Sequence, residues 1–116
     1  MNNYKLGHFA EFIALCFLCI KGYRKIRKNY FIGRGSGAGE VDLILCKGKT
    51  LVFVEVKKRV SLDEASYAIS STQQKRIRRA AEAFIKNNSK YKEYNIRFDA
   101  ILINKSFSIC HIKNAF

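Results

Sequence analysis

The clearest pattern of apolar and polar positions lies in residues 40–57, where two apolar, β-branched runs flank Gly48-Lys49. This pattern predicts a β-hairpin whose strands lie deep in a sheet. A Gly-X pair suits a two-residue type II′ turn, so the hairpin should pair Lys47 with Thr50. If the turn had three residues, the cross-strand partners would become diagonal neighbours.

The remaining patterns predict two helices and three further strands in one α/β domain over residues 1–116. Residues 6–21 are apolar on almost every side, which predicts a largely covered helix that ends at Gly22. A capping-box pattern at Ser61–Glu64 predicts a second helix over residues 62–87, loosened near residues 70–72. The other expected strands are 24–31, at a sheet edge with its Lys and Arg outward, 96–103 and 107–112.

The balance of charge favours a polyanionic partner. The chain carries 22 Lys and Arg against 9 Asp and Glu, a formal net charge of +13. Nucleic acid and an anionic membrane surface both fit this excess. The membrane interpretation ranks last, because we find no exposed amphipathic helix with a strong apolar face, and the run from Phe12 to Ile20 is too short to span a bilayer.

The cysteines favour a reduced, cytoplasmic setting. Cys16 and Cys19 form a C-x-x-C pair, but no second closely spaced Cys or His pair completes a zinc set. Both lie in the apolar run of the first helix, so we expect buried structural thiols. Cys46 and Cys110 are expected in the strand core.

Charged residues inside the hairpin are the first candidates for chemistry. Continued along the strands, the register places Asp42 opposite Glu55 and Glu40 opposite Lys57, all on one face. Buried carboxylates that face each other are costly unless a cation or a proton lies between them. A structural ion pair between Glu40 and Lys57 is the alternative, but it leaves Asp42 opposite Glu55 without a partner. We therefore favour Mg²⁺ or Mn²⁺ at the Asp42–Glu55 pair.

Three other titratable residues have less certain roles. Glu11, the only acid in the first helix, is either a solvated carboxylate or a group turned toward the hairpin site. Asp99 either adds a carboxylate to that site or, as we favour, pairs with Arg97 near a strand end. His111 is a lone His in a strand, and a structural role is expected.

Several basic segments are candidates for phosphate contacts. The stretch Gly33–Gly39 lacks the dinucleotide-binding fingerprint, because a strand follows it where a helix is needed, so a mobile loop is expected. The polar face of the second helix carries a run of positive charge that we expect to face phosphates. The residues expected to bind nucleic acid are Arg34 in the loop, Lys58 and Arg59 after the hairpin, and Gln74, Lys75, Arg76, Arg78 and Arg79 on the helix.

The hairpin residues also carry a family resemblance. Asp42, followed across the turn by Glu55-x-Lys57, is similar to the PD-(D/E)xK nuclease signature, without its proline. The chain more closely resembles the UPF0102 family of small bacterial proteins. The motifs that carry this resemblance are Gly39-Glu-Val-Asp-Leu-Ile44 and Phe53-Val-Glu-Val-Lys-x-Arg59, with Gly7-x-x-x-Glu11, Gly22-Tyr23, Arg27-Lys28-Asn29-Tyr30, Lys75-Arg-Ile-x-x-Ala80-Ala81 and Arg97-Phe-Asp99.

The resemblance implies a restriction-endonuclease-like αβββαβ core, a central mixed sheet flanked by helices, related to archaeal Holliday-junction resolvases. It implies that Glu11, Asp42, Glu55 and Lys57 form the site, the three acids as metal ligands. Glu40 belongs to the motif without an assigned role. The chain departs from the family pattern at Ala10, where the family usually has Gly, and in a longer Gly-rich loop.

Together these observations predict a Mg²⁺- or Mn²⁺-dependent endonuclease that cuts DNA, including branched DNA. The alternative from a different class is a nucleic-acid-binding module that keeps the fold and the acids but turns over poorly. A junction enzyme would act as a homodimer, because paired cuts need two sites. A small basic protein that stays monomeric until it meets nucleic acid is the other expectation.

Overall fold

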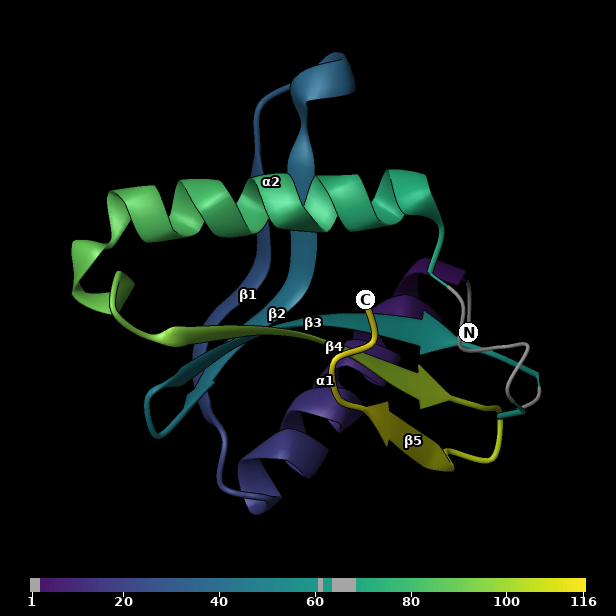
Figure 1. Ribbon diagram of the computed structural model, residues 1–116. Coiled ribbons are helices and arrows are strands. Elements are labelled where there is room, and N and C mark those ends of the chain that lie inside the picture. The colour runs from purple at the N-terminus through teal and green to yellow at the C-terminus, as the bar shows by residue number, and fades with distance from the viewer. Residues whose placement is uncertain (1–2, 61, 64–68) are drawn as a thin grey trace.

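A computed structural model describes residues 3–60, 62–63 and 69–116 as an α/β fold with helices flanking a mixed sheet (Figure 1), which confirms the predicted fold class. The last strand extends the expected αβββαβ core. The elements are α1 (Asn3–Ile20), β1 (Arg24–Ile32), η1 (Gly35–Gly37), β2 (Gly39–Lys47), β3 (Thr50–Lys58), α2 (Ser71–Asn87), η3 (Ser89–Tyr91), β4 (Asn95–Ile103) and β5 (Ile109–Ile112).

The five strands form one sheet in the order β1-β2-β3-β4-β5, so β1 is at an edge, as predicted. β3 and β4 are parallel, because the chain crosses the sheet through α2 between them, and the other neighbouring pairs are antiparallel. The helices lie on opposite faces, with α2 in front of the sheet and α1 behind it in Figure 1. Successive residues of a strand point to opposite faces of the sheet. Val52 therefore packs in the hydrophobic cluster between the sheet and α1, and Phe53 packs in the cluster between the sheet and α2.

The hairpin has the predicted register. Lys47 pairs with Thr50, and the pairing runs regularly to Leu43 and Val54. Gly48 has φ +59° and Lys49 is not among the residues with positive φ, as a type II′ turn requires.

The helix α1 ends where the sequence predicts. Gly22 adopts φ +96° and donates its N–H to the Cys19 carbonyl, and the Tyr23 N–H bonds to the Leu18 carbonyl. These two hydrogen bonds form a Schellman motif, which satisfies carbonyls at the helix end. Neither described helix is long and apolar enough to cross a membrane.

The outer face of α1 corrects the expectation of a largely covered helix. Only a stripe that includes Ala10, Ala14 and Leu18 is buried against the sheet. Phe12 is 54 % exposed and Ile20 is 87 % exposed. Cys16 and Cys19 are exposed free thiols, so the expectation that they are buried was wrong. An all-round apolar pattern does not reveal that only one side of the helix is packed against the described part of the chain.

The helix α2 begins at Ser71, about two turns later than predicted. Ser70 is the N-cap, and its Oγ accepts a hydrogen bond of 3.1 Å from the Gln73 N–H. Leu62 and Asp63 are not helical, and the other capping-box residues, Ser61 and Glu64, lie outside the described residues. The hydroxyl side chains of residues 70–72, where we expected a loosened helix, favour caps over helix interiors.

Gly39 places α2 against β2. A Cβ atom at this position would lie 2.6 Å from the Ala80 backbone N and 2.9 Å from the Arg76 carbonyl O. Gly39→Ala is therefore expected to lower the free energy of unfolding by about 1–3 kcal/mol, because the helix must move away from the strand. Urea denaturation measures the change. Gly37→Ala is the matched control, since nothing lies within 4 Å of its Cβ position, and an equal loss in both variants would contradict this account.

Candidate active site

The five predicted hairpin and helix residues meet in one pocket of about 210 Å³, which we call the acidic pocket. α1 contributes Glu11, β2 contributes Glu40 and Asp42, and β3 contributes Glu55 and Lys57. The full lining is Gly7, Ala10, Glu11, Glu40, Asp42, Glu55, Val56, Lys57, Lys58 and Gln73. The hairpin pattern thus predicted four of these charged residues, and the family resemblance added Glu11.

The pocket opens where β2 and β3 separate. Their regular pairing ends at Leu43 and Val54, although β2 continues to pair with β1 beyond this point. The Asp42 side chain enters the gap, and its Oδ2 accepts a hydrogen bond of 2.8 Å from the Val56 N–H. Asp42 therefore accepts a hydrogen bond from a backbone N–H of β3 that is no longer paired with the backbone of β2. Its carboxyl group is turned toward Glu55, although the two residues do not form a regular cross-strand pair.

Asp42 and Glu55 form an acidic pair of high electrostatic cost. Glu55 is only 8 % exposed. Burial, with a hydrogen bond to Glu55 and repulsion from its charge, raises the pKa of Asp42 to about 8. The Val56 N–H and Lys57 offset only part of this rise. The raised pKa of Asp42 means that the pair favours binding a proton, and a divalent cation can take the place of that proton.

Glu11 is turned toward the hairpin, which resolves the two interpretations of its position. It lines the acidic pocket, and burial together with the Asp42 charge raises its pKa. Its Oε1 is buried and accepts no hydrogen bond, while His8 Nδ1 lies 3.9 Å away. The Oε1 atom of Glu11 is therefore an unsatisfied acceptor in a pocket that contains three other carboxyl groups.

The structure replaces the alternative ion pair between Glu40 and Lys57 with two different contacts. Lys57 Nζ lies 3.8 Å from Glu55 Oε2, and Glu40 Oε1 lies 3.2 Å from Arg76 Nη2. Both groups of the first pair are largely covered, whereas those of the second are substantially exposed. Lys57 is thus directed into the pocket, and Glu40 is held at its rim by α2.

The donor set fits a hard divalent cation at the Asp42–Glu55 pair. Within residues 3–60, 62–63 and 69–116, no three His, Cys, Asp or Glu side chains stand close enough to enclose a metal. Two adjacent carboxylates with a third nearby nevertheless suit Mg²⁺, which typically keeps several waters and binds one or two carboxylates plus substrate phosphates. Asp42 and Glu55 would hold the ion, and Glu11 is the third candidate ligand.

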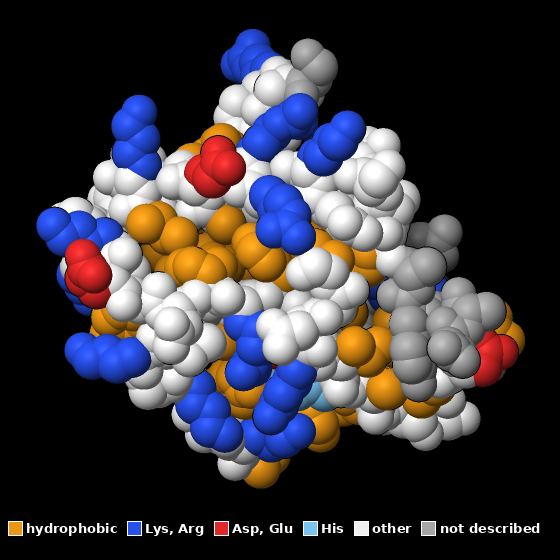
Figure 2. All heavy atoms as spheres, in the orientation of Figure 1, with side chains coloured by type: hydrophobic (Ala, Val, Ile, Leu, Met, Phe, Trp, Pro, Cys, Tyr) orange, Lys and Arg blue, Asp and Glu red, His pale blue; other side chains and the backbone are white. Residues whose placement is uncertain are grey.

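The basic residues expected to bind nucleic acid lie in different surroundings. Lys58 lines the acidic pocket, and Lys75 and Arg34 are exposed. The others make protein contacts: Arg59 Nη1 donates to the Lys58 carbonyl, Arg76 pairs with Glu40, Arg78 lies over the Phe98 and Phe116 rings, and Arg79 Nη1 lies 3.5 Å from the Ala38 carbonyl. Figure 2 shows that Lys and Arg side chains dominate over acids on the face that α2 crosses.

Gln73 is a pocket residue that we did not place in the site. Gln74, which we expected to contact nucleic acid, donates from Nε2 to the Ile69 carbonyl at 2.8 Å. Gln73, one position earlier, lines the acidic pocket. Because α2 begins at Ser71, Gln73 and Arg76 are three positions apart and lie on one side of its first turns. This helical spacing is the sequence signal that could have identified Gln73.

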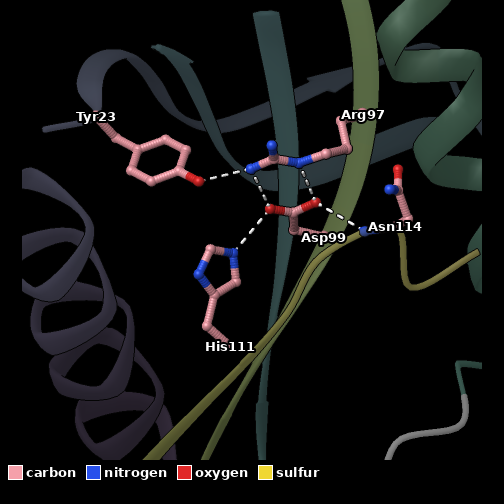
Figure 3. Close-up of polar contacts among 5 residues, drawn as sticks. All are labelled: Tyr23, Arg97, Asp99, His111 and Asn114. Atoms are coloured by element: carbon pink, nitrogen blue, oxygen red, sulfur yellow. Dashed lines mark hydrogen bonds and ion pairs between the residues drawn. The ribbon is translucent and has the colours of Figure 1, made fainter. Parts of the chain in front are cut away.

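Asp99 belongs to a separate buried network (Figure 3) and does not line the acidic pocket. Arg97 donates two hydrogen bonds of 2.9 Å to its carboxylate, as predicted, and another of 2.6 Å to the Tyr23 hydroxyl. His111 Nε2 lies 2.7 Å from Asp99 Oδ2, which gives His111 a structural contact. The expected strand-end position was wrong, because Asp99 is completely buried within β4.

Comparisons with known proteins place the chain among sequences without an assigned activity. The profile of "Uncharacterised protein family UPF0102" matches residues 10–103. A UPF0102 protein of Paramagnetospirillum magneticum is 43 % identical over 84 % of this chain and 75 % of its own length. Others are 42 % identical in Natranaerobius thermophilus, over the full length of both chains, and 38 % in Ehrlichia chaffeensis, over 98 % and 93 %.

Proposed function

Starting from the fact that the chain belongs to the UPF0102 family, we propose that it is a metal-dependent endonuclease acting on DNA, including branched DNA. The observation that carries this proposal is the buried Asp42–Glu55 carboxyl pair in a pocket on a strongly basic protein. When bound, Mg²⁺ or Mn²⁺ would balance the two acids, polarise a phosphate oxygen and make a coordinated water more acidic.

Each pocket residue has a role that follows from its position. Asp42 and Glu55 would hold the ion from two strands, and Glu11, on α1, is the third candidate ligand. Lys57, whose Nζ lies beside Glu55, orients the attacking water or stabilises negative charge that develops on the phosphate. Glu40 is paired with Arg76 and fixes that guanidinium at the pocket rim.

The remaining basic surface supplies affinity for the phosphate backbone. A formal net charge of +13 attracts nucleic acid without reading its sequence. Lys58 places one positive charge at the pocket itself, and Lys75 extends the basic surface along α2. Binding should therefore weaken steeply as the salt concentration rises.

A nucleic-acid-binding module with the same fold is the second candidate. The observation that favours it is that no three potential metal-binding side chains enclose a site within the described ranges. Such a module would bind DNA through its basic surface without cutting it. Metal dependence separates the two functions, because binding through counterion release needs no divalent ion.

Lys57→Ala tests the proposed chemistry. We expect the rate of cleavage to fall on the order of 10²–10³-fold, because a positioned donor next to the carboxyl pair is lost. DNA binding in EDTA should change little, since Lys57 is one largely covered charge among many exposed ones. The measurement uses a fluorescent four-way junction and its matched linear duplex, each with Mg²⁺, Mn²⁺ or EDTA.

Lys49→Ala is the matched control for Lys57→Ala, because Lys49 lies at the other end of the same hairpin, in the turn. It should cleave at the wild-type rate. The ratio of junction to duplex cleavage by the wild type defines the preferred substrate. Binding without cutting in every metal would overturn the proposal in favour of the binding module.

A further inference from the structure

A second cavity, of about 420 Å³, adjoins the acidic pocket at the ends of β3 and β4, and we call it the apolar cavity. Ala10 and Lys58 line both spaces, so the two cavities are neighbours. The Arg59 N–H bonds to the Ile103 carbonyl at 2.9 Å, which joins the two strand ends beneath the cavity. The lining is Ala10, Lys58, Arg59, Val60, Ile103, Asn104, Lys105 and Phe107.

An aromatic ring is presented to solvent at this cavity. Phe107 is 46 % exposed and lies in the β4–β5 loop with φ +61°. Asn104 organises the loop, because its carbonyl accepts the Phe107 N–H and its Oδ1 accepts the N–H groups of Ser106 and Ser108 at 2.9 Å. The Phe9 ring packs against Phe107 in a T-shaped pair with centroids 5.3 Å apart. The ring is therefore held in position although it is not buried.

The charges at the apolar cavity match a phosphate backbone. Lys58, Arg59 and Lys105 line it, and among the residues that the structure describes no acidic side chain lines it. An aromatic face within a positively charged groove is the combination that binds single-stranded nucleic acid, because bases stack on the ring while cations follow the phosphates. A base pair in the interior of a duplex cannot use such a ring, since both of its faces are stacked on neighbouring pairs.

We propose that the apolar cavity binds an unpaired nucleotide of the substrate, with its base against Phe107, next to the phosphate held in the acidic pocket. This inference rests on the proposed function and specifies its substrate as nucleic acid with a single-stranded segment beside the cut. Ala10 and Lys58, shared by both spaces, mark where the strand passes from one to the other. Lys105 contacts the backbone on the far side of the base.

Phe107→Ala tests the inference by fluorescence anisotropy in EDTA, where cleavage does not occur. The probes are a blunt duplex and the same duplex with a short single-stranded extension. Loss of stacking should weaken binding of the extended duplex about tenfold. Binding of the blunt duplex should change less than about twofold. Phe12→Ala is the control, because Phe12 is also an exposed ring but lines neither cavity.

An abasic nucleotide in the extension completes the test. If the base contacts the ring, one abasic position should weaken wild-type binding and remove most of the difference between wild type and Phe107→Ala. The inference would be overturned if Phe107→Ala weakened binding of both duplexes equally, if its effect persisted on every abasic probe, or if it had no effect. Each of these results would favour an apolar protein segment as the occupant of the cavity. Failure of the proposed function would give a different result: the protein would not cleave DNA with metal, even though its binding of the extended duplex depends on Phe107.

Discussion

Asp42→Asn is expected to slow metal-dependent cleavage by on the order of 10³-fold, because the proposed metal site would lose one carboxylate of the Asp42–Glu55 pair. The amide keeps the shape of the side chain and can still accept the Val56 N–H. The fold should therefore be retained, and DNA binding in EDTA should persist. Initial cleavage rates on the four-way junction measure the loss.

The same variant should be more stable than the wild type in EDTA at about pH 8. In the folded protein, burial and Glu55 raise the pKa of Asp42 from 3.8 to about 8. The unfolded chain loses this proton near pH 4, so the wild type loses stability as the pH rises from about 4 to about 8. Asn carries no such cost, and thermal denaturation should give a higher Tm.

Glu82→Gln is the matched control, because it makes the same chemical change on the exposed face of α2. It should alter neither the cleavage rate nor the pH dependence of stability. An Asp42→Asn protein that cleaves at the wild-type rate would contradict the assignment of Asp42 to the metal. A Tm for Asp42→Asn below that of the wild type would contradict the explanation that burial and Glu55 raise the pKa of Asp42.

Asp99→Ala is expected to destabilise the protein by about 3–5 kcal/mol, the second large effect. The substitution leaves the Arg97 guanidinium without the carboxylate that accepts two of its hydrogen bonds. It also removes the buried partner of His111 and of the Asn114 N–H. Urea denaturation measures the loss, and a change below about 1 kcal/mol would contradict a structural role for this network.

Acid provides an independent test of the same network. Although burial opposes ionisation, hydrogen bonds from His111 and Arg97 lower the pKa of Asp99 below its usual value. Its contribution to stability is therefore complete above the unfolded pKa near 4 and is lost as the pH falls through the folded pKa. Asp99→Asn should lack this part of the acid-induced loss. Cleavage by any folded fraction should persist, because Asp99 lies outside the acidic pocket.

The local pattern was sufficient to predict the hairpin and its four charged candidates, whereas Glu11 was assigned to the site only by the family resemblance. Gly48-Lys49 determines the register, and the register brings Asp42 near Glu55. The separation of the strands at Asp42 was not predictable from the hairpin. In this region β2 stays paired with β1 and contacts α2 at Gly39, and both neighbours come from outside the hairpin.

Interactions between distant segments explain what the sequence did not predict. Arg97 and Asp99 are two positions apart on one strand, so their pairing followed from the alternation of side chains. Tyr23 and His111 reach the same network from the end of α1 and from β5, and no local pattern indicates that contact. Cys16 similarly lies in an apolar run, yet it is exposed because nothing in the described structure covers the outer face of α1.

A titration of Mn²⁺ followed by electron paramagnetic resonance tests the central claim most directly, because it detects the ion without requiring cleavage. At about pH 8, where the Asp42 proton is readily displaced, the wild type should bind one ion per chain. Asp42→Asn should bind Mn²⁺ at least about tenfold more weakly, whereas Glu82→Gln should match the wild type. No binding by the wild type, or equal binding by Asp42→Asn, would contradict a metal site at the Asp42–Glu55 pair.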